Sequence, residues 1–168
     1  MPIREIVTLP HPSLRRKARP VTKFDNSLQT LIDDMIETMR AAPGIGLAAP
    51  QLGLSERLIV VEYGDEEDKE APKKLYALVN PELKVTSMET EVGAEGCLSV
   101  PGLLGEVERS LAVTVKGLNR RGQPMRIKAK GWLARIFQHE IDHLNGVVFT
   151  DRAAKVWKPA PQEAVDNV

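Results

Sequence analysis

The apolar positions of this chain predict one long amphipathic helix near its beginning. Asp25, Asn26 or Ser27 can cap the start of this helix, and Pro43-Gly44 can end it. Between these signals, apolar side chains recur at alternating spacings of 3 and 1, which places them on one face of a helix. These residues are Leu28, Leu31, Ile32, Met35, Ile36 and Met39. The pattern therefore predicts a helix whose apolar face packs against a core.

Shorter apolar runs predict β-strands in the rest of the chain. Strands are expected at residues 58–63, 75–79 and 83–85, and a short final one at residues 147–149. Residues 111–118 and 124–130 are predicted to pair as a hairpin across the turn at residues 119–122. The charged stretch 64–74 has no periodicity, so we expect a solvated loop there.

A second helix is predicted to begin at Gly131 and to end at Asn145-Gly146. Strands combined with one buried helix indicate an α+β fold, with mostly antiparallel sheets packed around that helix. We expect a single domain over residues 1–151. Residues 152–168 are expected to form a loose tail, because prolines and small residues interrupt them from Lys155 onward. The proline-punctuated residues 9–20 are expected to follow the surface as extended chain.

The composition is that of a globular protein and argues against several functional classes. The 168 residues suffice for one core, and 23 basic residues balance 23 acidic ones, so no global charge favours nucleic acid. No apolar run approaches the roughly 20 residues that span a bilayer, and the first residues lack the features of a signal or transit peptide. The single cysteine allows no intramolecular disulfide, which fits a reducing compartment. We therefore expect a cytoplasmic protein without a membrane partner.

The motif His139-Glu140-Ile141-Asp142-His143 carries the clearest chemistry in the chain. On a helix, residues four positions apart lie on the same face, so His139 and His143 can reach one metal ion. Glu140 lies between them, where it can act as a general base on a water at the metal. The motif predicts a metal-dependent hydrolase.

Two histidines leave this site short of one ligand, since a catalytic metal usually takes three protein ligands and a water. A carboxylate, a distant histidine or the lone cysteine could supply the third. His11 lies between prolines in a segment expected at the surface, which makes it a weak candidate. Cys97 alone would be interpreted as a small buried apolar residue. Gly96 before it permits close approach, and Pro101-Gly102 after it is expected to fix a turn, so beside this helix Cys97 is the favoured ligand.

Two apolar residues precede the histidines on the same helix face. Ile136 and Trp132 lie three and seven positions before His139, so both point toward the predicted metal. They could accept an apolar substrate side chain or simply fill the core.

Three segments together resemble the peptide deformylases. They are residues 44–51 (GIGLAAPQ), residues 95–99 (EGCLS) and residues 138–143 (QHEIDH), in this order, and the similarity runs from about Ile6 to Asp151. Any one of them would be only suggestive. Members of this family remove the formyl group from the N-terminal formyl-methionine of nascent polypeptides.

The resemblance implies a ligand set and a mechanism. Cys97, His139 and His143 would hold one divalent metal, Fe²⁺ in the typical family member, with Zn²⁺, Ni²⁺ or Co²⁺ as alternatives. Glu140 would act first as general base and then as general acid. The side-chain amide of Gln51 and the backbone N–H of Leu98 would stabilise the oxyanion.

The resemblance also implies how substrate is bound. The methionine side chain would enter a pocket of Ile45, Trp132 and Ile136, with Glu95 pairing with Arg109 behind it. The peptide backbone would run along Ile45-Gly46 as an added strand. The partner is the formylated nascent peptide, and contact with the ribosome exit region fits this function, although the balanced charge gives it no direct support. No nucleic-acid partner is expected.

Two other functions compete with this interpretation. A zinc endopeptidase shares the His-Glu-x-x-His motif, but it usually takes its third ligand from a histidine or carboxylate downstream, and the sequence after His143 has no histidine and few acids. A metal-stabilised binding domain would need a closed site, typically with four protein ligands, and only three good candidates are found.

Overall fold

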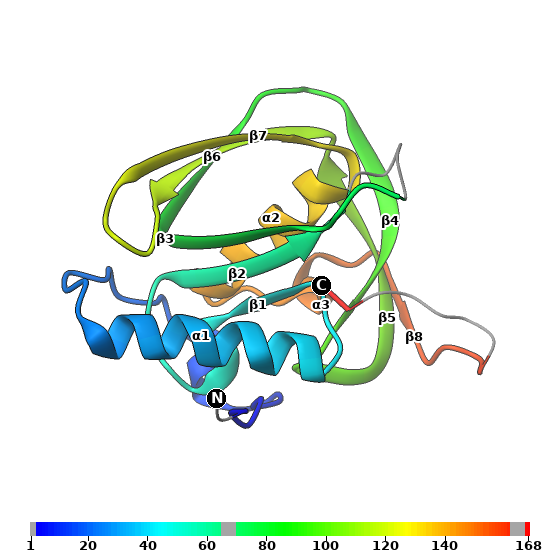
Figure 1. The fold of residues 1–168 in the computed structure, drawn as a ribbon. Coiled ribbons are helices and arrows are strands. Elements are labelled where there is room, and N and C mark those ends of the chain that lie inside the picture. Colours follow the sequence, from blue (N-terminus) through cyan, green and yellow to red (C-terminus); the bar gives the residue numbers. More distant parts are fainter. Residues whose placement is uncertain (1–2, 65–69, 162–166) are drawn as a thin grey trace.

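The computed structural model describes residues 3–64, 70–161 and 167–168. Within these residues the strands form two antiparallel sheets (Figure 1). The five-stranded sheet has the order β1-β2-β3-β6-β7, with β1 (Gly46–Ala48), β2 (Leu58–Tyr63), β3 (Lys74–Val85), β6 (Ala112–Leu118) and β7 (Pro124–Lys130). The three-stranded sheet has the order β4-β5-β8, with β4 (Thr90–Cys97), β5 (Val100–Ser110) and β8 (Lys155–Trp157). This architecture confirms the predicted α+β class.

Two long helices cover opposite faces of the larger sheet: α1 (Asn26–Ala41) on one face and α2 (Gly131–Leu144) on the other. The alternation along β2 produces this arrangement, since Leu58 and Val60 belong to the α1 core while Ile59 and Val61 belong to the α2 core. Helix α2 also contacts β5 of the smaller sheet. Helix α2 therefore lies between the two sheets, as predicted for the helix that carries His139 and His143.

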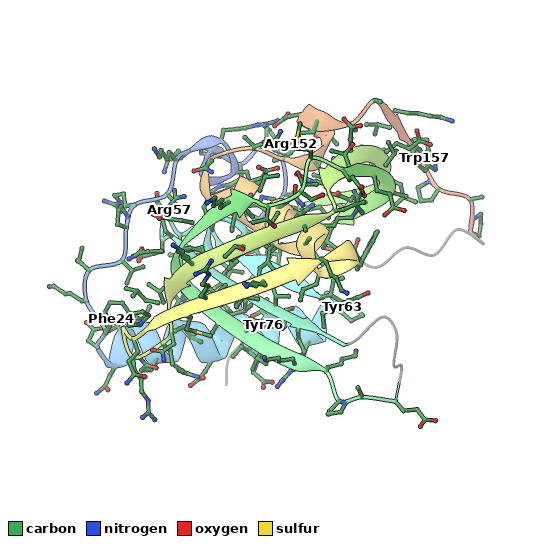
Figure 2. All side chains as sticks on the ribbon, turned by 90° about the horizontal axis from the view of Figure 1, so that it is seen from above. Phe24, Arg57, Tyr63, Tyr76, Arg152 and Trp157 are labelled. Atoms are coloured by element: carbon green, nitrogen blue, oxygen red, sulfur yellow. The ribbon has the colours of Figure 1, made fainter. Side chains whose placement is uncertain are left out.

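Shorter helical segments complete the architecture. They are η1 (Pro12–Arg15), η2 (Ala49–Leu52) and α3 (Phe149–Arg152). Figure 2 shows the molecule from above, with Phe24 on one side and Trp157, in β8 of the smaller sheet, on the opposite side. No helix in the described part of the chain is long and apolar enough to cross a membrane.

The predicted helices and the hairpin are confirmed, with Asp25 accepting a hydrogen bond from the Leu28 N–H at the start of α1. The strands predicted at residues 75–79 and 83–85 are one strand, β3, in which Asn80 adopts a positive φ of 52° and the pairing register shifts. Strands β4 and β5 were not predicted from the sequence. The burial along β4 rises steadily toward Cys97 instead of alternating, so the chain there lacks the period of two that marks a strand.

Two local predictions near the site are wrong. Residues 147–149 do not form a strand, because Phe149 begins α3 and the Asp151 carboxylate accepts a hydrogen bond from the Val148 N–H at its start. The turn predicted at Pro101-Gly102 lies earlier, since Cys97 already pairs with Val100 across residues 98 and 99.

The end of the chain is more ordered than the predicted loose tail. Residues Lys155–Trp157 form β8 on the edge of β5. Asn167 forms a β-bridge with Gly96, and Val168 is completely buried. Residues 65–69 of the predicted charged loop lie outside the described residues.

Candidate metal centre

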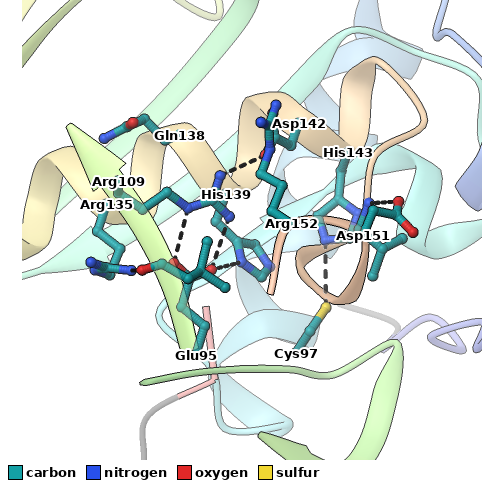
Figure 3. Close-up of polar contacts among 12 residues, drawn as sticks. Glu95, Cys97, Arg109, Arg135, Gln138, His139, Asp142, His143, Asp151 and Arg152 are labelled. Carbon is teal, nitrogen blue, oxygen red and sulfur yellow. Dashed lines mark hydrogen bonds and ion pairs between the residues drawn. The ribbon is translucent and has the colours of Figure 1, made fainter. Parts of the chain in front are cut away.

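Cys97, His139 and His143 come together in the interior, at the end of β4 and on helix α2 (Figure 3). One ligand atom from each lies within 4.8 Å of the others, and all three residues are buried. The Cys97 Sγ lies 3.4 Å from the His143 Nε2. The reversal of the chain directly after Cys97 aims its thiol at the helix, so a hairpin and a helix jointly build a three-ligand cluster.

His139 is oriented by a carboxylate behind it. Its Nδ1 lies 2.8 Å from the Glu95 Oε1, and an ionised carboxylate can only accept a hydrogen bond. The hydrogen therefore resides on Nδ1, which leaves the lone pair on Nε2. That Nε2 is buried without a hydrogen-bond partner among the described residues. A histidine fixed in this way by a carboxylate is the usual arrangement of a metal ligand.

Glu95 is itself held by two arginines. Arg109 donates two hydrogen bonds to it, each of 2.9 Å, and Arg135 donates one of 2.6 Å. Burial alone would raise the pKa of Glu95, but the hydrogen bonds from His139 and Arg109 outweigh it and hold this pKa well below its usual range. Glu95 thus remains a carboxylate at neutral pH and keeps His139 in one tautomer.

The charged contacts continue from Arg109 to the surface. Arg109 also donates a 2.6 Å hydrogen bond to Asp142, and the half-exposed Arg152 donates two more to the same carboxylate. We call Glu95, Arg109, Arg135 and Asp142 the rear network. Each of their charged groups has a charged partner.

Glu140 presents the opposite situation. Its side chain is completely buried, and neither carboxylate oxygen has a hydrogen-bond partner among the described residues. A Cβ atom added to Gly46 would lie 2.5 Å from the Glu140 Oε2, so β1 approaches this carboxylate as closely as a glycine permits. Burial first, and then the charge of Glu95, raise the pKa of Glu140 well above its ordinary value. We call Cys97, His143 and Glu140, with the Nε2 of His139, the front cluster.

The donor set of the front cluster suits a divalent transition metal. Burial, and then the charge of Glu140, raise the pKa of the Cys97 thiol, and a bound cation would reverse this by stabilising the thiolate. Burial, and then His139, lower the pKa of His143 well below its ordinary value, which favours the neutral imidazole that binds metals. One thiolate and two imidazoles are ligands for iron, zinc, cobalt or nickel.

The predicted oxyanion donors lie beside the cluster. The Gln51 Oε1 accepts a hydrogen bond from the Ala48 N–H, which turns its Nε2 toward Ser99 Oγ at 3.2 Å and Cys97 Sγ at 3.6 Å. Leu98 follows Cys97 in the chain reversal between β4 and β5. The side-chain amide of Gln51 is thus fixed next to the thiol.

The residues predicted to bind substrate are found in different places. Ile45, Trp132 and Ile136 share one apolar cluster, in which Ile136 is completely buried. Gly46 contacts Glu140 instead. Glu95, predicted to bind substrate, lies behind His139 with its side chain completely buried and its carboxylate engaged by His139, Arg109 and Arg135. Its predicted pairing with Arg109 is present.

His11 lies outside the cluster, where its Nδ1 accepts a hydrogen bond from the Ser13 N–H at the start of η1. Three residues of the site were given no role from the sequence: Ser99, which receives the Gln51 amide, Arg135, which anchors Glu95, and Asp142, which pairs with Arg109. A signal for Arg135 existed. It lies four positions before His139 on the same helix face, and a buried arginine there requires a carboxylate partner.

Comparison with known proteins gives a consistent result. The family model described as polypeptide deformylase matches residues 3–158. The peptide deformylase of Natranaerobius thermophilus is 51% identical over 158 residues, covering 94% of this chain and 97% of that one. The solved peptide deformylase of Thermotoga maritima has a TM-score of 0.85 and 44% identity, covering 92% of this chain and 100% of that one. A Met-Ala-Ser-bound structure of the class I type b enzyme from Acinetobacter baumannii has a TM-score of 0.82 and 38% identity, covering 90% and 98%.

Proposed function

The chain belongs to the polypeptide deformylase family, whose members hydrolyse the N-formyl group from nascent polypeptides, and we propose that it does so through the front cluster. The observation that carries this proposal is the position of Glu140. It is a buried carboxylate without a partner, between two histidines that face a thiol. Such a carboxylate is costly in a protein interior unless it serves a ligand or a reaction.

We assign Cys97, His139 and His143 as the ligands of one divalent metal ion. When bound, this ion supplies Lewis-acid polarisation and an acidified water for attack on the formyl carbon. Glu140 takes up the proton that this attack releases and delivers it to the departing amine. Both oxygens of Glu140 are available for this transfer, because no side chain or backbone group of the described residues occupies them.

Gln51 and Leu98 would stabilise the negative charge that develops on the formyl oxygen. The Gln51 amide is oriented by the Ala48 N–H, and one of its two N–H groups would exchange its present acceptor, the Ser99 Oγ or the Cys97 Sγ, for the formyl oxygen. The Leu98 N–H follows the ligand Cys97 directly. In other enzymes, removal of one such donor costs about 3–4 kcal/mol of transition-state stabilisation.

The methionine side chain would contact Ile45, Trp132 and Ile136, which form one apolar cluster beside the site. The peptide backbone would pair with the edge of β1 at Ile45-Gly46. The Acinetobacter baumannii relative binds Met-Ala-Ser, a peptide that begins with methionine as the deformylated product does. A residue larger than Gly46 would displace Glu140 in this arrangement.

The tight packing of β1 against Glu140 also suggests how the enzyme selects formyl groups. A formyl group carries hydrogen where an acetyl group carries a methyl, and we propose that the site rejects this methyl by steric contact. Release of acetate from acetyl-Met-Ala-Ser at a rate comparable to formate release from formyl-Met-Ala-Ser would contradict this explanation.

We further propose Fe²⁺ as the native metal, with Zn²⁺, Ni²⁺ and Co²⁺ as substitutes, and the bacterial cytoplasm near the ribosome exit region as the place of action. The ligand set favours no single one of these ions, since availability decides occupancy as much as affinity does. Ribosome contact follows only from the substrate, which is a nascent chain.

Formate release tests the function directly. Protein purified anaerobically is incubated with formyl-Met-Ala-Ser and, in parallel, with casein. We expect formate from the first and no new peptide termini from the second. Cleavage of internal casein bonds without formate would identify an endopeptidase instead. Against that alternative, the third ligand candidate lies upstream of the histidine motif, at Cys97, and not downstream of it.

A further inference from the structure

Residues Asn167 and Val168 lie between the edge strands of two sheets. Strand β1 is at the edge of the five-stranded sheet and β4 is at the edge of the three-stranded sheet. An edge strand presents unpaired N–H and C=O groups, which an extended peptide can satisfy by adding a strand. Figure 1 shows the C-terminal end of the chain at the end of β1, close to β4.

The short segment pairs with both edges at once. The backbone N–H of Ile45, directly before β1, donates a 3.0 Å hydrogen bond to the Asn167 carbonyl. The Val168 N–H donates a 3.1 Å hydrogen bond to the carbonyl of Gly96 in β4. Asn167 and Gly96 form a parallel β-bridge. We call this place between Ile45 and Gly96 the bridging position. Its occupant is held as a strand is held in a sheet.

The side chains of the segment fit their surroundings closely. Val168 is completely buried and belongs to the same apolar cluster as Ile45, Trp132 and Ile136. A Cβ atom added to Gly96 would lie 2.9 Å from the Asn167 Oδ1, so the Asn167 side chain packs against a position that has room only for glycine. An apolar side chain is therefore buried in the same cluster to which the residues assigned to the methionine side chain of substrate belong.

The bridging position adjoins the reactive groups on both sides. Gly96 directly precedes the ligand Cys97, and Ile45 directly precedes Gly46, which lies against the Glu140 carboxylate. A peptide that pairs with Gly96 is therefore one residue away from the ligand Cys97. A peptide that pairs with Ile45 is one residue away from Gly46, which contacts Glu140. This is where a substrate backbone must run if its N-terminal formyl group is to reach Glu140.

We propose that Asn167-Val168 is an intramolecular ligand for the bridging position, where it competes with the backbone of formylated peptides assigned above to the edge of β1. This inference rests on the proposed function for the identity of the competing substrate. The segment resembles a bound peptide in its backbone pairing and in its buried aliphatic side chain. It must leave before substrate binds.

Competition of this kind has a defined kinetic signature. The apparent affinity for substrate is reduced by the fraction of molecules in which the position is free. If the segment occupies it about nine-tenths of the time, its removal lowers KM about tenfold. The turnover number stays unchanged, because the bound state that reacts is the same with and without the segment.

Three variants of the full chain test this. Deletion of residues 167–168 removes the occupant, and Val168→Asp places a charge where the valine is buried. Val156→Asp is the matched control, because it makes the same substitution at a 40% exposed position of β8. Formate release is measured over a range of formyl-Met-Ala-Ser concentrations, and thermal melting monitors folding. We expect KM to fall between three- and tenfold in the first two variants, with kcat within twofold of the parent, and no change in the control.

An unchanged or higher KM in both folded variants would overturn the proposal. If one variant fails to fold, the other decides. A synthetic peptide of residues 159–168 gives a second measurement: we expect it to bind the deletion variant more tightly than the parent in calorimetry, and equal or absent binding would count against the proposal. Calorimetry also separates the two hypotheses, since a protein that binds this peptide but frees no formate refutes the proposed function and not the intramolecular ligand.

Discussion

The rear network and the front cluster are both buried and both rich in charge, yet they are satisfied in opposite ways. In the rear network, every charged group has a charged partner within 2.9 Å. In the front cluster, the Nε2 of His139 and both oxygens of Glu140 have no hydrogen-bond partner among the described residues. His139 connects the two, with Nδ1 on Glu95 and Nε2 in the front cluster. We infer that the rear network fixes positions and that the front cluster serves a ligand and the chemistry.

Energetics explain why both regions are needed. Each buried polar group without a partner costs about 1–3 kcal/mol, and a metal that binds the folded state offsets such costs. The rear network gains little net stability from its ion pairs, because desolvation of the charges opposes their attraction. Its contribution is the fixed orientation of His139. Changes in the two regions should therefore have different consequences.

The largest effect is expected from Glu140→Gln in the front cluster. The amide keeps the shape of the side chain but cannot accept the proton, so kcat for formate release should fall by about 10²–10⁴-fold. Metal content, measured by elemental analysis, should stay at the parent level because Glu140 is not a ligand. A variant that retains more than a tenth of the activity would show that another group carries the proton.

Glu95→Gln breaks the rear network and is expected to act through His139. The neutral amide leaves Arg109 and Arg135 without their shared carboxylate, which should lower the free energy of unfolding by about 3–5 kcal/mol. Loss of the carboxylate behind His139 should weaken metal affinity about 10–100-fold, measured by competition with a chelator. Glu106→Gln, at an exposed position of the neighbouring strand β5, serves as control. Equal metal affinities in Glu95→Gln and Glu106→Gln would show that Glu95 does not position His139.

Gly46→Ala sharpens the comparison because it changes the front cluster without removing a functional group. The new methyl would lie 2.5 Å from the Glu140 Oε2, and the carboxylate must move to admit it. We expect kcat to fall on the order of tenfold, since misplacement of a reacting group by 1 Å can cost up to about 10²-fold. Gly64→Ala is the matched control, because its nearest neighbour lies 3.9 Å from the added carbon. Unchanged activity in Gly46→Ala would show that Glu140 needs no fixed position.

The smallest effect is expected from Arg152→Ala at the outer end of the rear network. The Arg152 side chain is 49% exposed, and surface ion pairs contribute about 0–1 kcal/mol. Asp142 keeps its contact with Arg109 in this variant. Stability in urea should therefore change by less than about 1 kcal/mol, with kcat and metal content unaffected. A loss of metal in this variant would show that Arg152, at the surface, also helps to position His139.

The sequence predicts the site far better than it predicts the surrounding sheet. Helix α2 and its histidines follow from spacing alone, because the period of a helix determines which side chains share a face. Strand β4 has no regular alternation, since it passes from the surface into the interior along its length. Burial does alternate over residues 105–109 of β5, but two of the buried positions are Gly105 and Arg109, so the apolar pattern of a strand is missing there. The family resemblance implied the pairing of Glu95 with Arg109, but the contacts of Glu95 with His139 and Arg135 were not predicted, because both residues reach it from a helix far along the chain. The burial of Val168 depends on contacts with two sheets that local sequence does not reveal.

The central claim is that the front cluster works by holding a divalent metal beside Glu140. Its most direct test is formate release from formyl-Met-Ala-Ser before and after the metal is removed with a chelator, followed by anaerobic addition of Fe²⁺. We predict one equivalent of metal per active chain, loss of activity with the metal, and recovery with Fe²⁺ in the parent but not in Cys97→Ala. Full activity in protein shown by elemental analysis to be free of metal would contradict the account.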